Sequence, residues 1–204
     1  MFIEQPPLLY RIFFPSVHWR FRAEKKVVYL TFDDGPIPEM TPWVLDLLDS
    51  YNIKATFFCV ADNVRKHPEI YQKILKRGHL TGNHTYHHLQ GWQTDTKTFL
   101  RDVEEAKQLI DSPLFRPPHG HIRPSQLRAV AKRFKVIMWD VVARDYSRKR
   151  TSEQVLENVK KYTRNGSVIV FHDSLRAQGK LEEALPKSIE WLLAQGYSFQ
   201  LIPA

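Results

Sequence analysis

The chain alternates short apolar runs with amphipathic segments, and this regularity restricts the folds open to it. Runs rich in β-branched and aromatic residues, such as residues 27–30 and 55–60, predict buried strands. Segments with apolar residues at helical spacing follow them, at residues 39–50 and 96–110. Repeated strand-then-helix units predict an α/β fold with a parallel sheet, either doubly wound or closed into a barrel. The expected number of strands, about seven or eight, favours the barrel.

The remaining elements continue this alternation over a single domain. Further strands are expected at residues 79–83, 114–116, 136–139, 167–171 and 197–201. Further helices are expected at residues 68–76, 125–134 and 181–194, and one begins at Thr151 with a capping signature. Residues 1–22, rich in Pro and aromatic residues, show no clean period. We expect them to form an arm packed on a domain that spans residues 23–204.

Length and composition exclude several classes of protein. A chain of 204 residues with 43% hydrophobic residues suits one soluble domain with a full core. The single cysteine, Cys59, excludes an internal disulfide framework and a multi-cysteine zinc knuckle. No apolar run approaches membrane-spanning length, so no transmembrane segment is expected. Glu4 and Pro6 interrupt the apolar core that a signal peptide needs, so no signal peptide is expected in the sequence as written. The expected location is cytoplasmic, with export or association with the cell envelope left open.

The net charge of +8 permits weak attraction to anionic polymers but does not indicate nucleic-acid binding. The basic residues are scattered, which is typical of a solvated surface. One local cluster comprises Arg144, Arg148, Lys149 and Arg150. We expect no nucleic-acid partner.

Polar clusters follow the predicted strands, beginning with Asp33 and Asp34. Two adjacent carboxylates raise each other's pKa unless a cation is shared between them. Further clusters are His84 to His88, Arg116 to Gly120, Asp140 with Asp145 and Tyr146, and His172 with Asp173. The His-x-x-x-His spacing can place two imidazoles on one side of a helical turn, as a metal site requires. Each cluster alone has an ordinary structural explanation, but together they indicate a site at the carboxyl ends of the strands.

These segments resemble a known family. T-F-D-D-G-P, H-T-x-x-H, R-P-P-x-G, D-Y and F-H-D occur in the order typical of the polysaccharide deacetylase family (carbohydrate esterase family 4, NodB homology domain). The resemblance runs from roughly Lys25 to the C-terminus. It implies a distorted (β/α)7-type barrel and one divalent metal ion, zinc, with cobalt or nickel as alternatives. It also implies hydrolytic removal of acetyl groups from N-acetylated, sometimes O-acetylated, sugars of a polysaccharide or oligosaccharide.

The resemblance also implies roles for single residues. The metal ligands would be Asp34, His84 and His88. The catalytic groups would be the base Asp33 with its partner Arg116, and the acid His172 with its partner Asp145. The substrate would meet the backbone N–H of His119, an acetyl pocket formed by Ile169 and Phe171, and Tyr146. An Asp-His-His set leaves open positions on Zn²⁺, as a hydrolytic metal site requires.

Three positions depart from the family pattern. His119 stands where Tyr is usual, Tyr146 where Trp is common, and His87 where a small residue is usual. His87 would either crowd the metal or offer it a third imidazole. These departures keep open a metal-binding but weakly active or inactive carbohydrate-binding barrel.

A phosphatase of the haloacid dehalogenase type is a weaker alternative, suggested by Phe-Asp-Asp-Gly. That chemistry needs Asp-x-Asp spacing and gives no role to His84, His88 or His172. The glycan, its chain length and the oligomeric state are left open.

Overall fold

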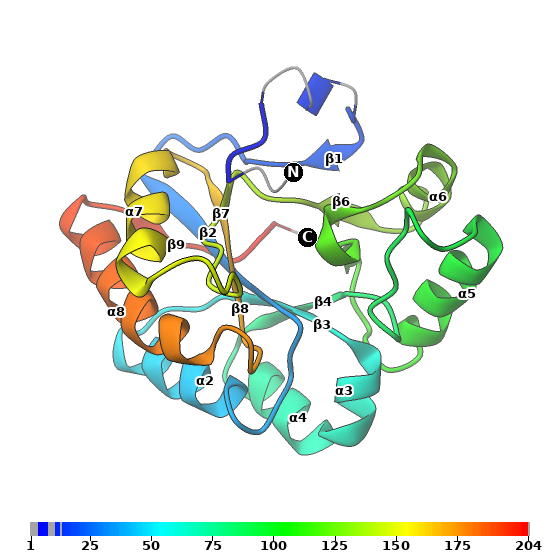
Figure 1. Ribbon diagram of the computed structural model, residues 1–204, viewed down its shortest axis with the longest axis horizontal. Coiled ribbons are helices and arrows are strands. Elements are labelled where there is room, and N and C mark those ends of the chain that lie inside the picture. The colour runs from blue at the N-terminus through cyan, green and yellow to red at the C-terminus, as the bar shows by residue number, and fades with distance from the viewer. Residues whose placement is uncertain (1–3, 8–10, 13, 204) are drawn as a thin grey trace.

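The computed structural model describes residues 4–7, 11–12 and 14–203. Its strands are β1 (Val17–His18), β2 (Val27–Asp33), β3 (Thr56–Cys59), β4 (Leu80–Asn83), β5 (Leu114–Phe115), β6 (Lys135–Ile137), β7 (Val141–Val142), β8 (Val168–His172) and β9 (Ser198–Phe199). They form one parallel sheet in the order β1-β6-β5-β4-β3-β2-β8-β7, with β9 paired to β2. The sheet curls into the distorted barrel that the sequence predicted (Figure 1).

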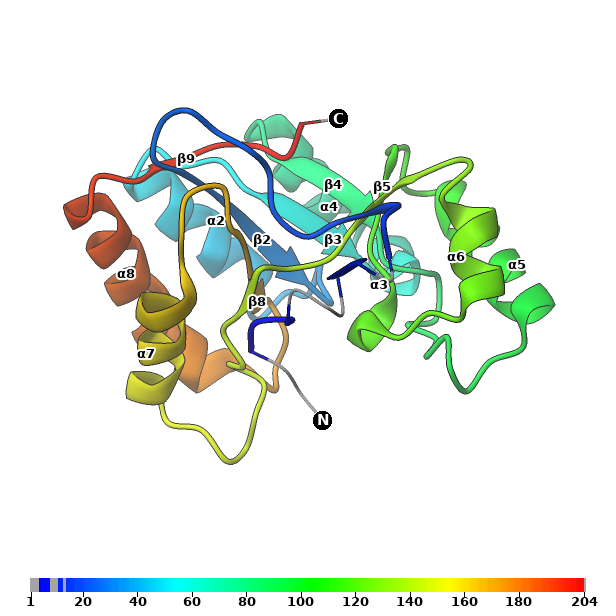
Figure 2. The ribbon, with the colours of Figure 1, turned by 90° about the horizontal axis from the view of Figure 1, so that it is seen from above.

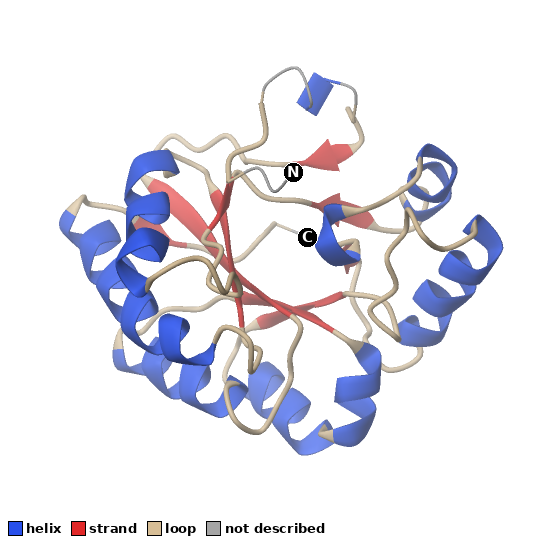
Figure 3. Ribbon diagram, in the orientation of Figure 1, coloured by secondary structure: helices blue, strands red, loops and turns tan. Residues whose placement is uncertain are grey.

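Helices surround this sheet (Figure 3). They are α2 (Thr41–Ser50), α3 (Ala61–Lys66), α4 (Pro68–Lys76), α5 (Thr96–Lys107), α6 (Pro124–Val130), α7 (Ser152–Tyr162) and α8 (Gln178–Ala194), with a 3-10 turn η1 at Pro118–Gly120. Figure 2 shows α7 and α8 at one end of the molecule and α5 and α6 at the other. None of the helices in the described part of the chain is long and apolar enough to cross a membrane.

The alternation of side chains along β2 separates the core from the site. All seven residues of β2 are buried. Leu30 and Phe32 belong to the large apolar cluster shared with the helices, whereas Thr31 and Asp33 both accept hydrogen bonds from Arg116 on the inner side of the sheet. Because successive side chains of a strand point to opposite faces, one strand supplies both packing and a reactive carboxylate.

Most elements agree with the prediction from periodicity. The predicted helix at residues 68–76 is α4, and Thr151 caps α7 in a capping box with Gln154. The short helix α3 and the two-residue strand β7 were not predicted. Only Ala61 and Val64 of α3 are buried, and so short an element leaves no readable period.

Part of the predicted arm forms an edge strand of the sheet. β1 pairs with β6, with Val17 opposite Val136. Arg11 donates to the buried carboxylate of Asp140, with 2.5 Å between its Nη2 and Oδ1. The basic cluster is also engaged here, because Arg144 and Arg150 both pair with Glu4. The boundary proposed at residue 22 stays a prediction, and residues 1–3, 8–10 and 13 of the arm lie outside the described residues.

Candidate active site

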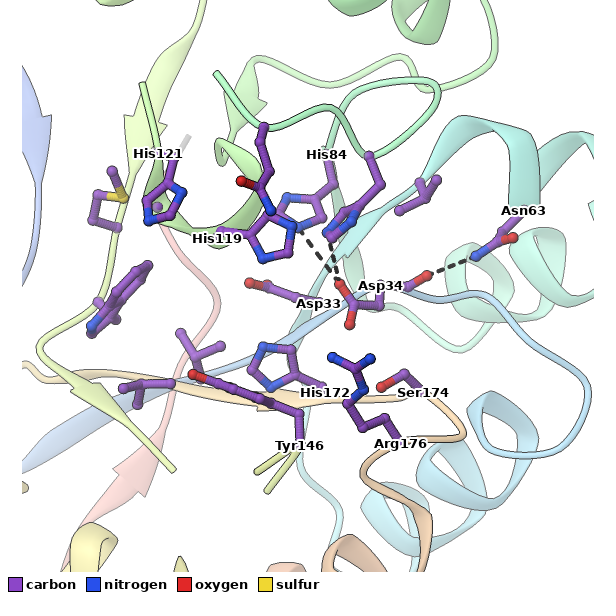
Figure 4. Close-up of a pocket in the computed structure, with 18 of the residues that line it drawn as sticks. Asp33, Asp34, Asn63, His84, His119, His121, Tyr146, His172, Ser174 and Arg176 are labelled. Carbon is purple, nitrogen blue, oxygen red and sulfur yellow. Dashed lines mark hydrogen bonds and ion pairs between the residues drawn. The ribbon is translucent and has the colours of Figure 1, made fainter. Parts of the chain in front are cut away.

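The carboxyl ends of the strands open into one pocket with a volume of about 860 Å³. Side chains at or just after the ends of β2, β4, β5 and β8 line it, among them Asp34, His84, His119 and His172 (Figure 4). The polar clusters recognised in the sequence therefore meet in space. A pocket of this size suits a small organic ligand or part of a polymer.

Asp33 lies on the inner side of β2 and is bound by Arg116. The two side chains are almost fully buried, and Arg116 Nη1 lies 2.5 Å from Asp33 Oδ1. The guanidinium also donates to the carbonyl oxygens of Ile137 and Met138 and stacks over the Phe58 ring, so its orientation is determined on every side. Burial raises the pKa of the Asp33 carboxyl, and Arg116 opposes this rise.

Asp34, His84 and His88 form the cluster that can hold a metal ion, with their ligand atoms all within 4.8 Å of one another. Asp34 Oδ1 lies 3.2 Å from His88 Nε2 and 3.8 Å from His84 Nε2. The His84 Nδ1 lies 2.8 Å from the carbonyl oxygen of Arg116, which favours the tautomer whose Nε2 lone pair faces Asp34. Burial lowers the pKa of His84 well below its usual value, so the ring is neutral and can bind a metal ion through a nitrogen lone pair. Two imidazoles and a carboxylate are ligands that Zn²⁺ prefers.

The two histidines converge through a loop and not on a helical turn, contrary to the prediction from spacing. Residues 84–88 form no helix, and Thr85 and His88 have φ values of 65° and 56°. Asp102 on α5 holds this loop, because its Oδ2 accepts the backbone N–H groups of Tyr86 and His87 at 2.7 and 3.0 Å. A buried carboxylate thus orients the residues between the two imidazoles.

His87 belongs to a different environment from the metal cluster. Its Nδ1 lies 2.5 Å from Asp102 Oδ1, its side chain is 58% exposed, and it does not line the pocket. In this structure it neither crowds the cluster nor adds a third imidazole to it.

His172 lies beside Asp33, because the register of β2 and β8 places the two residues opposite each other. Its Nδ1 is 2.8 Å from Asp145 Oδ1, and its backbone N–H donates to Asp145 Oδ2. Burial alone would lower the pKa of His172, but the carboxylate of Asp145 raises it to about 9. The ring is therefore an imidazolium near neutral pH, and its Nδ1 contact leaves Nε2 as the nitrogen not bound to Asp145. Tyr146 packs edge-on against this ring.

Ile169 and Phe171 do not form the predicted acetyl pocket. Both are fully buried in the apolar cluster between the sheet and the helices, where Phe171 stacks on Phe32. Val170 lines the pocket instead. Because side chains alternate along a strand, Val170 and His172 share a face, and the predicted residues lie on the other.

His119 has a φ of 59° in the turn η1, and its ring packs against His88 with 4.7 Å between centroids. Burial lowers the pKa of His119 to about 4. The role of its backbone N–H stays a prediction.

Several pocket residues were missed in the sequence. Among them are Trp92, which stacks on His121 with 3.9 Å between ring centroids, and Ser174 and Arg176 in the loop after β8. Ser174 and Arg176 lie within three residues of the end of the F-H-D segment, so their place beyond a strand end was a usable signal. Trp92 lies in a loop without periodicity and offered none.

The fold and the pocket define a barrel protein with an enzyme-like site at the carboxyl ends of its strands. The model of the family described as polysaccharide deacetylase matches residues 21–139, and the chain belongs to this family. A peptidoglycan-N-acetylglucosamine deacetylase of Bacillus cereus is 31% identical over 191 residues, which cover 90% of this chain and 89% of that protein.

Solved structures agree in fold. A peptidoglycan N-acetylglucosamine deacetylase in complex with 4-naphthalen-1-yl-N-oxidanyl-benzamide is 31% identical, with a TM-score of 0.85 over 97% of this chain and 95% of that one. A mutant of a carbohydrate esterase family 4 pseudoenzyme with restored enzymatic activity is 26% identical. Its TM-score is 0.79 over 92% of this chain and 70% of that one. The family thus includes both enzymes and a pseudoenzyme.

Proposed function

We propose that the protein is a metal-dependent hydrolase that removes acetyl groups from N-acetylated sugars of a polysaccharide or oligosaccharide. The observation that carries this proposal is the convergence of three groups in one pocket. The Asp34–His84–His88 cluster lies beside an Arg116-bound Asp33 and an Asp145-bound His172. These are a metal site, a carboxylate base and an imidazolium acid, the set that amide hydrolysis requires.

The donor set fits a divalent ion, zinc in this proposal, with cobalt or nickel as alternatives. When bound by Asp34, His84 and His88, such an ion supplies Lewis-acid polarisation of the acetyl carbonyl and a more acidic water. His84 is prepared for this role by its contact with the Arg116 carbonyl, which presents Nε2 to the cluster.

The protein's own groups divide the proton transfers between them. Asp33 accepts a proton from the attacking water while Arg116 holds its carboxylate in place. His172 donates a proton to the amine nitrogen, so that the C–N bond breaks to give acetate and a free amino sugar. The backbone N–H of His119 is the proposed donor to the carbonyl oxygen that becomes negatively charged.

The base is tested by acetate release from N-acetylglucosamine oligomers with zinc added. Asp33→Asn should lower kcat by roughly 10²- to 10⁴-fold, the range for one acid–base group. It should keep its metal, because the three proposed ligands remain. Asp34→Ala and His88→Ala should lose the ion while their far-UV circular dichroism is unchanged. Stoichiometric metal in both of these variants, by elemental analysis, would show that the ligand assignment is wrong.

A second candidate is a metal-binding but weakly active or inactive carbohydrate-binding barrel. It is supported by the pseudoenzyme among the similar structures and by the imidazole at position 119. Binding of acetylated oligosaccharides without turnover, in protein loaded with metal, would favour this candidate. Release of acetate from acetylxylan alone would instead indicate an O-deacetylase.

A further inference from the structure

Arg176 is a cation at the pocket with no partner among the described residues. It follows β8 in the loop before α8 and lines the cavity. Figure 4 shows its guanidinium directed into the cavity, between His172 and Ser174 and below Asp34 in that view. Its side chain takes part in neither a hydrogen bond nor an ion pair with any residue that the structure describes.

The other charged groups of the site are already paired. Asp33 is bound to Arg116, and His172 is bound to Asp145. Asp34 faces the imidazoles of the metal cluster. A metal ion at that cluster would engage the carboxylate of Asp34 and repel a nearby guanidinium. Arg176 therefore contributes a positive charge that is available to a ligand.

Ser174 adds a hydroxyl donor on the same loop. Its Oγ is buried, lines the pocket and has no hydrogen-bond partner among the described residues. The guanidinium fork matches a carboxylate through two parallel N–H···O contacts, and a hydroxyl can donate a third hydrogen bond. A neutral sugar hydroxyl can accept a hydrogen bond from Arg176 but leaves its positive charge uncompensated.

We propose that Arg176, with Ser174 beside it, binds a carboxylate of the substrate. The preferred glycan then carries an acidic group close to the acetamide that is hydrolysed. This inference rests on the proposed function, because the pocket must hold an acetamido sugar. It narrows the substrate class to acidic N-acetylated glycans and assigns the selectivity to one side chain outside the metal cluster and the acid–base pairs.

The test compares two substrates that differ only in the acidic group. One is an oligosaccharide of alternating N-acetylglucosamine and N-acetylmuramic acid with free lactyl carboxylates, and the other is the same oligosaccharide with these groups converted to carboxamides. Binding is measured by calorimetry with zinc-loaded protein in an Asp33→Asn background, where turnover is suppressed. Arg176→Gln should raise the Kd for the carboxylate form by about ten- to hundredfold, the range for a hydrogen-bonded charge. The Kd for the carboxamide form should change by less than about threefold.

The matched control is Arg128→Gln, which removes an exposed cation from α6, outside the pocket. It should change neither Kd, whereas Arg176→Lys should retain part of the preference for the carboxylate. Equal affinity of the parent protein for both oligosaccharides would overturn the inference, as would an equal loss for both in Arg176→Gln. Acetate release by the wild type is scored separately. A carboxylate preference that depends on Arg176 but comes without acetate release would support the inference and contradict the proposed function.

Discussion

The contact between His172 and Asp145 makes the protonation of one residue depend on the charge of another. Asp145 is fully buried and binds both the ring and the backbone N–H of His172. The pKa of His172 is about 9, so the proton-donating form is present at lower pH and is lost as the pH rises through this value. The alkaline limb of the activity profile should therefore report this pair.

Asp145→Asn should move the alkaline limb of kcat/KM to lower pH, because the imidazolium loses the charge that raises its pKa. The measurement is a pH–rate series for acetate release by the wild type and the variant. Glu105→Gln, which removes an exposed carboxylate that does not line the pocket, should leave the limb in place. An unmoved limb in Asp145→Asn would remove His172 from the role of acid.

Single residues also show where prediction from sequence stops. The pairing of Asp33 with Arg116 was predictable because both belong to recognisable segments at strand ends. The residues that line the pocket wall were not predictable, because an apolar strand does not reveal which alternate side chains face inward. Val170 lines the pocket, whereas the predicted Ile169 and Phe171 lie in the apolar cluster. Arg176 and Trp92 lie in loops, where periodicity carries no information.

The turn after β2 is built around Gly35. Its N–H donates to Asp173 Oδ1, and a Cβ at this position would lie 2.0 Å from Asp173 Oδ2. Asp173 cannot move away easily, because it is buried and also accepts a 2.6 Å hydrogen bond from Thr41. Asp173, just after β8, thus links the turn to the first residue of α2 by hydrogen bonds. These contacts lie immediately beside Asp34.

Gly35→Ala should lower the free energy of unfolding by about 1–3 kcal/mol, the cost of overpacking, and should weaken zinc binding through the displaced turn. Gly179→Ala is the matched control, since nothing lies within 4 Å of its added Cβ in α8. It should raise stability by up to about 1 kcal/mol because Ala is the better helix former. Urea unfolding and zinc titration check both variants. Equal behaviour of the two would contradict a specific role for the turn.

Among the helices, strands and loops, long periodic elements were predictable from the sequence, and short or irregular ones were not. The helix predicted at residues 68–76 is α4, whose buried Ile70 and Ile74 lie four residues apart on one face. The His-x-x-x-His spacing predicted a helical turn, but His84 and His88 lie in a loop. Two residues of this loop adopt positive φ, and a carboxylate on α5 binds its backbone. The Asp102 contact joins residues 15 or more positions apart, so the spacing of the two histidines alone does not reveal it.

At the scale of the whole molecule, Asp140 joins the N-terminal arm to the barrel. Its buried carboxylate accepts hydrogen bonds from Arg11, Arg164 and Ser167. Asp140→Asn should reduce the free energy of unfolding by about 3 kcal/mol. This value is the lower end of the range for breaking a buried ion pair, because the Arg164 side chain is half exposed.

Urea unfolding measures this loss. The control is Glu104→Gln, which breaks the exposed pair with Arg133 and should cost at most about 1 kcal/mol. A loss of similar size in the two variants would contradict the joining role of Asp140.

The barrel itself was predictable, because repeated strand–helix units leave few arrangements of a parallel sheet. The place of β1 was not. A two-residue strand in a segment without period shows its partner only after folding, when β6 presents its edge.

This pairing has a consequence for the order of folding. The first strand of the chain pairs with β6, and all of β2 to β5 lies between them in sequence. During synthesis β1 therefore cannot pair until the chain has been made through β6. Long-range contacts of this kind form late, because the entropy of closing a long loop is lost before they contribute. Val17→Ala should accordingly speed unfolding in stopped-flow measurements while leaving the refolding rate nearly unchanged. The strand that begins the chain can thus pair only after β2 to β6 have been made.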